Sequence, residues 1–209
     1  MNSMNDPIYG RFFAVSRHRL ATDGKGITTL CTFHGCPLHC RYCINKRFLA
    51  SEQGCFDLTP DELYQRVAID ELYFLATGGG VTFGGGEPLL YPDFLCAFKE
   101  LCGNKWQLNI ETSLYVEKDA VIAASKVIDT FIVDIKETDP AIYARYTGCK
   151  NDRVLANLKL LLSLVGSRRI VIRLPLIPAF NTEAHRQKSK ALLTEMGFTQ
   201  FNLFTYTVN

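Results

Sequence analysis

Three cysteines lie within one eight-residue segment, residues 36–43, and no fourth cysteine continues the series. Three residues separate Cys36 from Cys40 and two separate Cys40 from Cys43, so one compact loop can direct all three sulfur atoms toward one bound group. Thiolates are soft ligands that favour zinc or iron–sulfur clusters. A 4Fe–4S cluster has four iron corners, and three cysteines would leave one iron open to a substrate or cofactor. The spacing favours such an open cluster.

Two other interpretations stay open on spacing alone. A structural zinc site needs four ligands, usually in paired C-x-x-C motifs, and the nearby extra candidates are His34 and His39. The three cysteines could also be unrelated buried side chains, which would make their clustering a coincidence. The other five cysteines lack metal-binding spacing, and we expect small buried side chains there: Cys31, Cys55, Cys96, Cys102 and Cys149.

Alternating strands and helices must position this segment. Hydrophobic patterns and helix-start signals divide the chain into six strand–helix units. Strands are expected at 27–33, 81–83, 107–111, 130–136, 169–174 and 201–206. Helices are expected at about 60–75, 91–102, 117–125, 152–165 and 182–196, and a further helix should begin at 140. This alternation requires a parallel sheet with right-handed crossovers, so we expect an α/β fold curved into an open barrel.

Polar residues recur where the predicted strands end. The cysteine segment directly follows the first strand, and the carboxyl ends of parallel strands are where α/β folds place their active sites. Asp134 and Lys136 are two residues apart on an extended strand, so their side chains should share one side. The other strand ends carry Glu87, Glu111 and Arg173.

Length and composition fit one domain. The chain has 209 residues, 47% of them hydrophobic, and a net charge of +2, which favours neither nucleic acid nor a membrane surface as a partner. We expect a single domain over residues 1–209, in which 1–22 form an N-terminal extension with a short strand at 12–15 and a basic turn at 17–19. The polar start resembles no signal peptide, so the cysteines are expected in a reducing cytoplasm.

The motifs together resemble a known superfamily. The C-x3-C-x2-C segment with Tyr42 before its last cysteine resembles the signature of radical S-adenosylmethionine enzymes, and Gly-Gly-Gly-Glu-Pro at 84–88 resembles their second motif. Residues 23–29 further resemble the activating enzymes of glycyl radical enzymes, such as pyruvate formate-lyase activating enzyme. The resemblance covers about residues 23–206. It implies a partial (β/α)6 barrel of the TIM type, with parallel strands and the cluster loop after the first strand.

The resemblance also implies roles for individual residues. Cys36, Cys40 and Cys43 would hold a 4Fe–4S cluster, and the amino and carboxylate groups of S-adenosylmethionine would chelate its fourth iron. Gly85, Gly86 and Glu87 would hold the amino group of that cofactor. Tyr42 would pack beside the adenine, and Asp134 and Lys136 would contact the methionine portion. Arg173 would meet a carboxylate of the cofactor or the main chain of a substrate.

This sequence departs from the family pattern in two places. Glu111, Thr112, Ser113 and Leu114 stand where the activating enzymes commonly carry Asp-Thr-Asn-Gly; Glu111 and Thr112 keep the charge and the hydroxyl for cofactor binding. Because Leu114 replaces a glycine, we expect the loop to avoid a positive φ there. Thr207 stands where a histidine is typical, and no ferredoxin-like insert separates 43 from 84, so a single cluster is expected.

The implied function is cleavage of S-adenosylmethionine to a 5′-deoxyadenosyl radical, which generates a glycyl radical on a partner enzyme. A one-electron donor such as flavodoxin or ferredoxin and an oxygen-poor cytoplasm would be needed. One alternative is a radical enzyme that modifies a peptide or a small metabolite. Another is a non-catalytic iron–sulfur protein for electron transfer or sensing, which would explain the cysteines but not the glycine motif or the strand-end charges.

Overall fold

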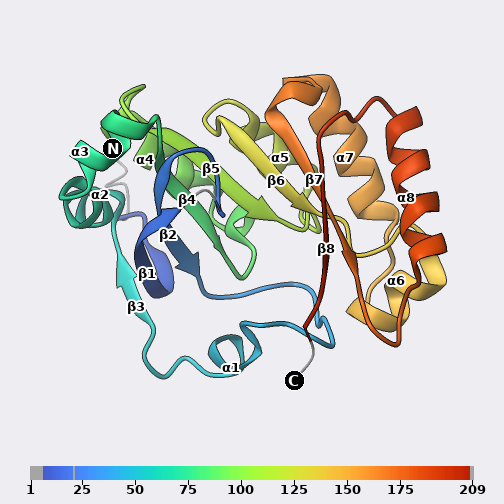
Figure 1. The fold of residues 1–209 in the computed structure, drawn as a ribbon. Coiled ribbons are helices and arrows are strands. Elements are labelled where there is room, and N and C mark those ends of the chain that lie inside the picture. The colour runs from blue at the N-terminus through green and yellow to red at the C-terminus, as the bar shows by residue number, and fades with distance from the viewer. Residues whose placement is uncertain (1–6, 21, 208–209) are drawn as a thin grey trace, which may run out of the picture.

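The computed structural model describes residues 7–20 and 22–207, and these residues form one eight-stranded sheet (Figure 1). The order across the sheet is β3-β1-β2-β4-β5-β6-β7-β8. The strands are β1 (Gly10–Leu20), β2 (Ile27–Phe33), β3 (Phe56–Leu58), β4 (Gly80–Gly85), β5 (Gln107–Thr112), β6 (Thr130–Asp134), β7 (Ile170–Leu176) and β8 (Phe201–Thr205).

Helices follow the strands in alternation, as the sequence predicts. They are α1 (Lys46–Leu49), α2 (Pro60–Ala68), α3 (Glu71–Thr77), α4 (Pro92–Cys102), α5 (Lys118–Ser125), α6 (Pro140–Thr147), α7 (Asp152–Val165) and α8 (Glu183–Glu195). Thr59 caps α2 in a capping box with Glu62, and Asp139 caps α6, which confirms the predicted helix starts. No helix in the described ranges is long and apolar enough to cross a membrane.

The six strands expected from the sequence pair in parallel, from β2 through β8. The sheet is open because its edges are the different strands β3 and β8. This arrangement confirms the predicted open (β/α)6 barrel. Two antiparallel strands extend it at one edge: β1 pairs with β2, and the three-residue β3, which the sequence analysis did not predict, pairs with β1.

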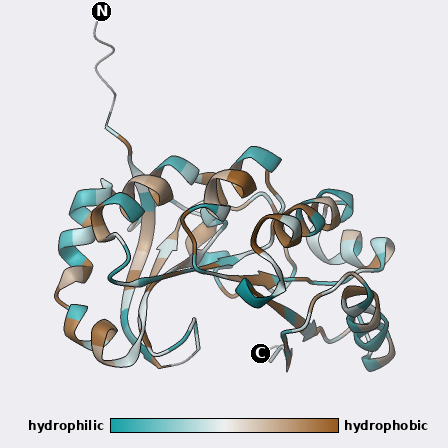
Figure 2. Ribbon diagram, turned by 90° about the horizontal axis from the view of Figure 1, so that it is seen from above, coloured by the Kyte–Doolittle hydropathy of each residue, from teal (hydrophilic) through white to brown (hydrophobic). Residues whose placement is uncertain are grey.

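Each central strand presents one apolar face and one polar face. In β4 and β5, Val81, Phe83, Leu108 and Ile110 are fully buried in the hydrophobic core. The alternating residues instead give the barrel interior its polar side chains, among them Thr82, Asn109, Glu111, Asp134 and Arg173. Figure 2 shows helices with mixed hydrophilic and hydrophobic residues surrounding the sheet. The alternation of side chains along each strand thus directs polar groups into the barrel interior.

The N-terminal strand is longer than expected. Phe12 to Val15 lie in β1 as predicted, but the basic residues 17–19, which we expected to form a turn, also belong to this strand. The pairing register shifts between Ser16 and Arg19, and His18 has φ = 56°. This bulge lets Arg17 and His18 both reach Asp70, at 2.6 and 3.1 Å.

The helix expected at 60–75 is two helices. The chain breaks between α2 and α3 at Asp70, whose carboxylate is fully buried and accepts hydrogen bonds from Arg17 and from the Thr29 hydroxyl at 2.8 Å. Burial by itself would raise the pKa of Asp70, but these partners outweigh it and lower the pKa below 3.8. Long-range contacts therefore end α2 where the local pattern predicts its continuation.

The five cysteines without metal-binding spacing behave in two ways. Cys31 and Cys102 are buried, as expected. Cys55, Cys96 and Cys149 are partly exposed, so the prediction of burial was wrong for these three.

Candidate functional site

The cysteine loop leaves β2 at the carboxyl end of the sheet and crosses to the neighbourhood of the β8 end before it returns to α1 (Figure 1). Backbone hydrogen bonds fix its path. The amides of His39 and Arg41 donate to the carbonyls of Thr147 and Tyr146, at 2.9 and 3.0 Å. The end of α6 therefore supports the loop on both sides of Cys40.

One pocket, with a cavity volume of about 230 Å³, collects nearly all the residues singled out from the sequence. Its lining includes eleven of the twelve predicted site residues: Cys36, Cys40, Tyr42, Cys43, Gly85, Gly86, Glu111, Thr112, Asp134, Lys136 and Arg173. Glu87 does not line it. The sequence analysis missed other lining residues, among them Asn45, Ser113, Tyr146, Phe204 and Tyr206.

The three loop cysteines line the same pocket. Among the described residues, no three His, Cys, Asp or Glu side chains are grouped as ligands of one metal ion. Cysteine thiolates are the usual protein ligands of a 4Fe–4S cluster. Burial raises the pKa of Cys36 to about 12 and also raises that of Cys40. A positively charged group is therefore needed to hold these thiols in the thiolate form, and bound iron would supply that charge.

Lys136 and Asp134 form a mostly buried ion pair. The Lys136 ammonium lies 3.1 Å from Asp134 Oδ2 and donates to the Tyr206 hydroxyl at 2.9 Å. Burial alone would lower the pKa of Lys136, but Asp134, Tyr206 and Cys40 raise it well above 10.5. Asp134 Oδ1 is buried without a hydrogen-bond partner in the described part of the chain. The pair thus offers a cation and a free carboxylate oxygen inside the pocket.

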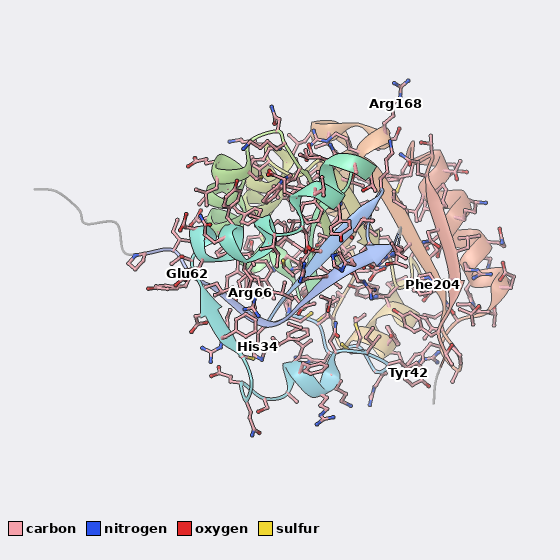
Figure 3. All side chains as sticks on the ribbon, turned by 60° about the vertical axis from the view of Figure 1, so that its left-hand side comes forward. His34, Tyr42, Glu62, Arg66, Arg168 and Phe204 are labelled. Carbon is pink, nitrogen blue, oxygen red and sulfur yellow. The ribbon has the colours of Figure 1, made fainter. Side chains whose placement is uncertain are left out.

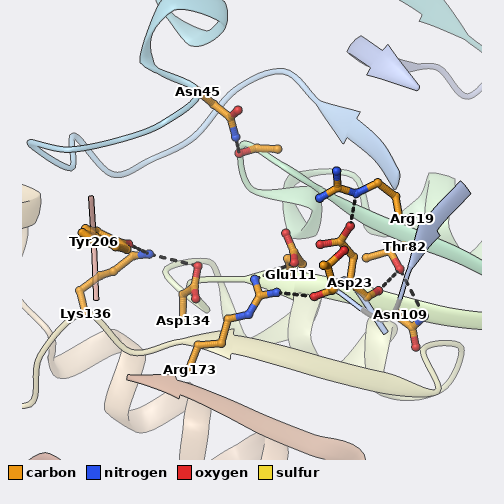
Figure 4. Close-up of polar contacts among 12 residues, drawn as sticks. Arg19, Asp23, Asn45, Thr82, Asn109, Glu111, Asp134, Lys136, Arg173 and Tyr206 are labelled. Carbon is orange, nitrogen blue, oxygen red and sulfur yellow. Dashed lines mark hydrogen bonds and ion pairs between the residues drawn. The ribbon is translucent and has the colours of Figure 1, made fainter. Parts of the chain in front are cut away.

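Glu111 and Arg173 form a second mostly buried ion pair in the barrel, with Nη1 and Oε1 2.6 Å apart (Figure 4). Burial raises the pKa of Glu111, although Arg173 opposes the effect. Arg173 also donates to the Thr22 carbonyl at 3.0 Å. Asp23 lies beside this pair and binds Arg19, so the loop between β1 and β2 closes against the barrel interior.

Glu87 is fully buried and its carboxylate is occupied by protein groups. Oε1 accepts from the Thr112 hydroxyl at 2.7 Å and the Leu89 amide at 3.2 Å, and Oε2 accepts from the Ser113 amide and hydroxyl at 2.9 and 2.6 Å. Burial raises the pKa of Glu87 against these bonds. In this arrangement Glu87 shapes the turn after β5.

The turn after β5 contradicts the expectation for Leu114. Its φ is 58°, the left-handed conformation that we expected a leucine to avoid. The Leu114 amide donates to the Thr112 hydroxyl at 2.9 Å, and Asn157 on α7 donates to the Leu114 and Val116 carbonyls at 2.9 and 2.8 Å. The Leu114 side chain is fully buried. These contacts offset the conformational strain.

Aromatic residues form one wall of the pocket. Tyr42 lies edge-on to Tyr146 and Phe180, with ring centroids 6.1 and 5.5 Å apart. Tyr146 also lies 6.3 Å from Tyr206. Figure 3 labels Tyr42 from the cysteine loop and Phe204 from β8 on the same side of the molecule. Only Tyr42 was singled out from the sequence, because the others have no motif and meet through the fold.

Comparisons with known proteins agree with this geometry. The family model described as Radical SAM superfamily matches residues 30–187. The chain is 28% identical to the (2S)-3-sulfopropanediol dehydratase activating enzyme of Klebsiella oxytoca, with 93% of this chain and 80% of the relative covered. It is also 28% identical to the pyruvate formate-lyase 2-activating enzyme of Escherichia coli K12, with 94% of this chain and 77% of that enzyme covered.

Solved structures show the same fold. Streptococcus suis SuiB bound to the precursor peptide SuiA matches with a TM-score of 0.63 at 17% identity, over 82% of this chain and 37% of SuiB. This chain therefore spans well under half of SuiB. TYW1 with a lysine-pyruvate adduct bound matches with a TM-score of 0.61 at 16% identity, over 87% of this chain and 65% of TYW1. With the family model covering well over half of its residues, this chain belongs to the radical S-adenosylmethionine superfamily, whose members use a 4Fe–4S cluster and S-adenosylmethionine.

Proposed function

We propose that this chain activates a glycyl radical enzyme by removing a hydrogen atom from a backbone glycine of that partner. The observation that carries the proposal is one pocket in which three thiols, a glycine-rich backbone and the Asp134–Lys136 pair meet. Similarity to proteins named as activating enzymes, over 93% and 94% of this chain for the two relatives above, supports the activating role.

Cys36, Cys40 and Cys43 would hold the cluster, because they are the thiols that line the pocket. When bound, the cluster and S-adenosylmethionine together supply the one-electron chemistry that yields a 5′-deoxyadenosyl radical. A flavodoxin or ferredoxin in an oxygen-poor cytoplasm would provide the electron.

The protein's own groups would orient the cofactor. The backbone of Gly85 and Gly86 and the unpartnered Oδ1 of Asp134 would accept hydrogen bonds from the cofactor's amino group. Lys136, whose raised pKa keeps it protonated, would bind its carboxylate. Arg173, paired with Glu111, and the pocket residue Thr112 would complete this polar end.

The aromatic wall would enclose the adenine and keep water from the reacting atoms. Tyr42, Tyr146 and Tyr206 give this side of the pocket large apolar surfaces with polar tips. Exclusion of water protects a radical from side reactions. A polypeptide loop of the partner would cover the side that remains open.

The test is an anaerobic assay of reconstituted protein for 5′-deoxyadenosine release under a strong reductant, with Cys40→Ala as the control. Electron paramagnetic resonance of a candidate glycyl radical enzyme, mixed with the active protein, should then show a glycyl radical. Release of 5′-deoxyadenosine without any partner radical would favour a peptide or metabolite substrate. No release from protein with a full cluster would favour the non-catalytic iron–sulfur interpretation.

A further inference from the structure

The cysteine loop and the glycine segment 85–87 must keep a fixed separation, because one would hold the cluster and the other the cofactor. Upstream of the cysteines, two backbone bonds join them: the Gly86 amide donates to the Phe33 carbonyl at 2.9 Å, and the Glu87 amide donates to the Gly35 carbonyl at 2.8 Å. A Cβ on Gly86 would lie 2.0 Å from the Gly35 oxygen, so the two backbones touch here. The entry to the loop is therefore rigidly placed.

Downstream of the cysteines, one side chain makes the corresponding connection. The Asn45 amide nitrogen donates to the Gly85 carbonyl at 2.8 Å (Figure 4). Gly85 pairs with Phe33 in the β2–β4 ladder, and a Cβ on Gly85 would lie 2.7 Å from the Thr32 Cβ, so its backbone packs closely against β2. Asn45 thus anchors the exit of the loop, two residues after Cys43, to a fixed carbonyl.

The position of Asn45 directly before α1 shows that its side chain does not act as a helix cap. Asn45 is the residue before α1, where an asparagine usually accepts a hydrogen bond from the first turn. Here its side chain makes no such cap and instead reaches across to β4. The helix itself is attached separately, because Phe48 stacks on Phe13 with ring centroids 5.0 Å apart. The α1 helix therefore has a contact with β1 that does not depend on the Asn45 bond.

We infer that Asn45 is a positioning residue that fixes the distance between the cluster ligand Cys43 and the Gly85 backbone. This inference rests on the proposed function, in which the same cofactor amino group meets both the open iron and the glycine segment. If the loop exit shifts, the cofactor cannot satisfy both sets of contacts at once. Asn45 also lines the pocket, so its amide stands where the cofactor would arrive.

Three variants separate hydrogen-bond donation from shape. Asn45→Asp keeps the size but cannot donate to Gly85, Asn45→Ala removes the group, and Asn104→Ala changes an exposed asparagine as a matched control. Anaerobic equilibrium dialysis would measure the Kd for S-adenosylmethionine with each reconstituted protein. We expect both Asn45 variants to bind about five- to tenfold more weakly, the effect of one lost hydrogen bond, at unchanged iron content per chain.

Two spectroscopic measurements complement the dialysis, and the first of them needs no S-adenosylmethionine. Hydrogen–deuterium exchange of the cluster-loaded protein should rise in peptides from residues 43–50 in Asn45→Asp and stay unchanged elsewhere. The change that S-adenosylmethionine causes in the electron paramagnetic resonance of the reduced cluster should also weaken in both Asn45 variants.

Wild-type binding and exchange in Asn45→Asp would overturn the inference. Equal loss of iron and of thermal stability in all Asn45 variants would also overturn it, because the residue would then serve folding alone. Failure of the part of the proposed function on which this inference rests is a separate result, because the unaltered protein itself would then not bind S-adenosylmethionine.

Discussion

The guanidinium of Arg173 on β7 and the carboxylate of Glu111 on β5 meet across the intervening strand β6, with Nη1 2.6 Å from Oε1. Their side chains are 17% and 19% exposed, so water screens the pair weakly. Asp23 and Asp134 lie near enough to raise the pKa of Arg173 further against the effect of burial. Arg173 is therefore a positive charge that favours the ionised forms of Glu111, Asp134 and Asp23 together.

Replacing Arg173 with methionine should destabilise the protein at neutral pH, because Glu111 would remain buried without its partner. We expect a loss of about 3 kcal/mol in the free energy of unfolding. Urea unfolding of the cluster-free protein at pH 7 measures it. Since the pKa of Glu111 is already raised, acidification should protonate this group and reduce the loss. A variant as stable as wild type at pH 7 would contradict the role given to Arg173.

Replacing Lys136 with methionine should weaken S-adenosylmethionine binding at least tenfold. The pocket would lose the ammonium group that binds the cofactor's carboxylate, and Asp134 would be left unpaired. The exposed Lys118 provides the control substitution. In the unaltered protein, the high pKa of Lys136 predicts no loss of binding between pH 7 and pH 9 through this group. Isothermal titration under anaerobic conditions measures both effects, and unchanged affinity in Lys136→Met would exclude this contact.

Replacing Glu87 with glutamine should loosen the turn after β5. The new amide group would face the Ser113 amide, so two donors would oppose each other where Oε2 now accepts two hydrogen bonds. We expect a loss of about 1–3 kcal/mol in the free energy of unfolding. Ser113→Ala, which removes one donor, should cost less. If thermal unfolding of Glu87→Gln matches that of the wild type, the carboxylate does not hold the turn.

Replacing Asp70 with asparagine should cost about 2 kcal/mol at pH 7, because the contacts from Arg17 and Thr29 weaken. The folded-state pKa of Asp70 is depressed, so its contribution is present above pH 3.8 and is lost as pH falls through the folded value. The difference between wild type and Asp70→Asn should therefore shrink toward pH 3. Urea unfolding at both pH values would show a constant difference if Asp70 did not titrate this way.

The sequence predicts the six parallel strands because each has a local apolar pattern, and it predicts the cysteine loop because its spacing is local too. It fails at Leu114 and Asp70. The conformation of Leu114 depends on Asn157, 43 residues away, and the break at Asp70 depends on Thr29, 41 residues away. Such contacts decide backbone conformations that local preferences disfavour.

The same limit explains the missed site residues. Tyr146 and Tyr206 come from α6 and from the segment after β8, and nothing in their neighbouring residues marks them as pocket residues. Glu87 illustrates the opposite case, in which a motif identifies the right place while the folded structure gives the side chain a different set of contacts.

The polar contacts drawn in Figure 4 include three positive and three negative side chains: Arg19, Arg173, Lys136, Asp23, Glu111 and Asp134. Their charges cancel, so this interior is balanced as a set rather than residue by residue. Exchange of one charged residue for a neutral one leaves the barrel with an unmatched charge, whereas exchange of two opposite ones does not. Diversification of this cavity, in nature or by design, should therefore proceed through paired substitutions.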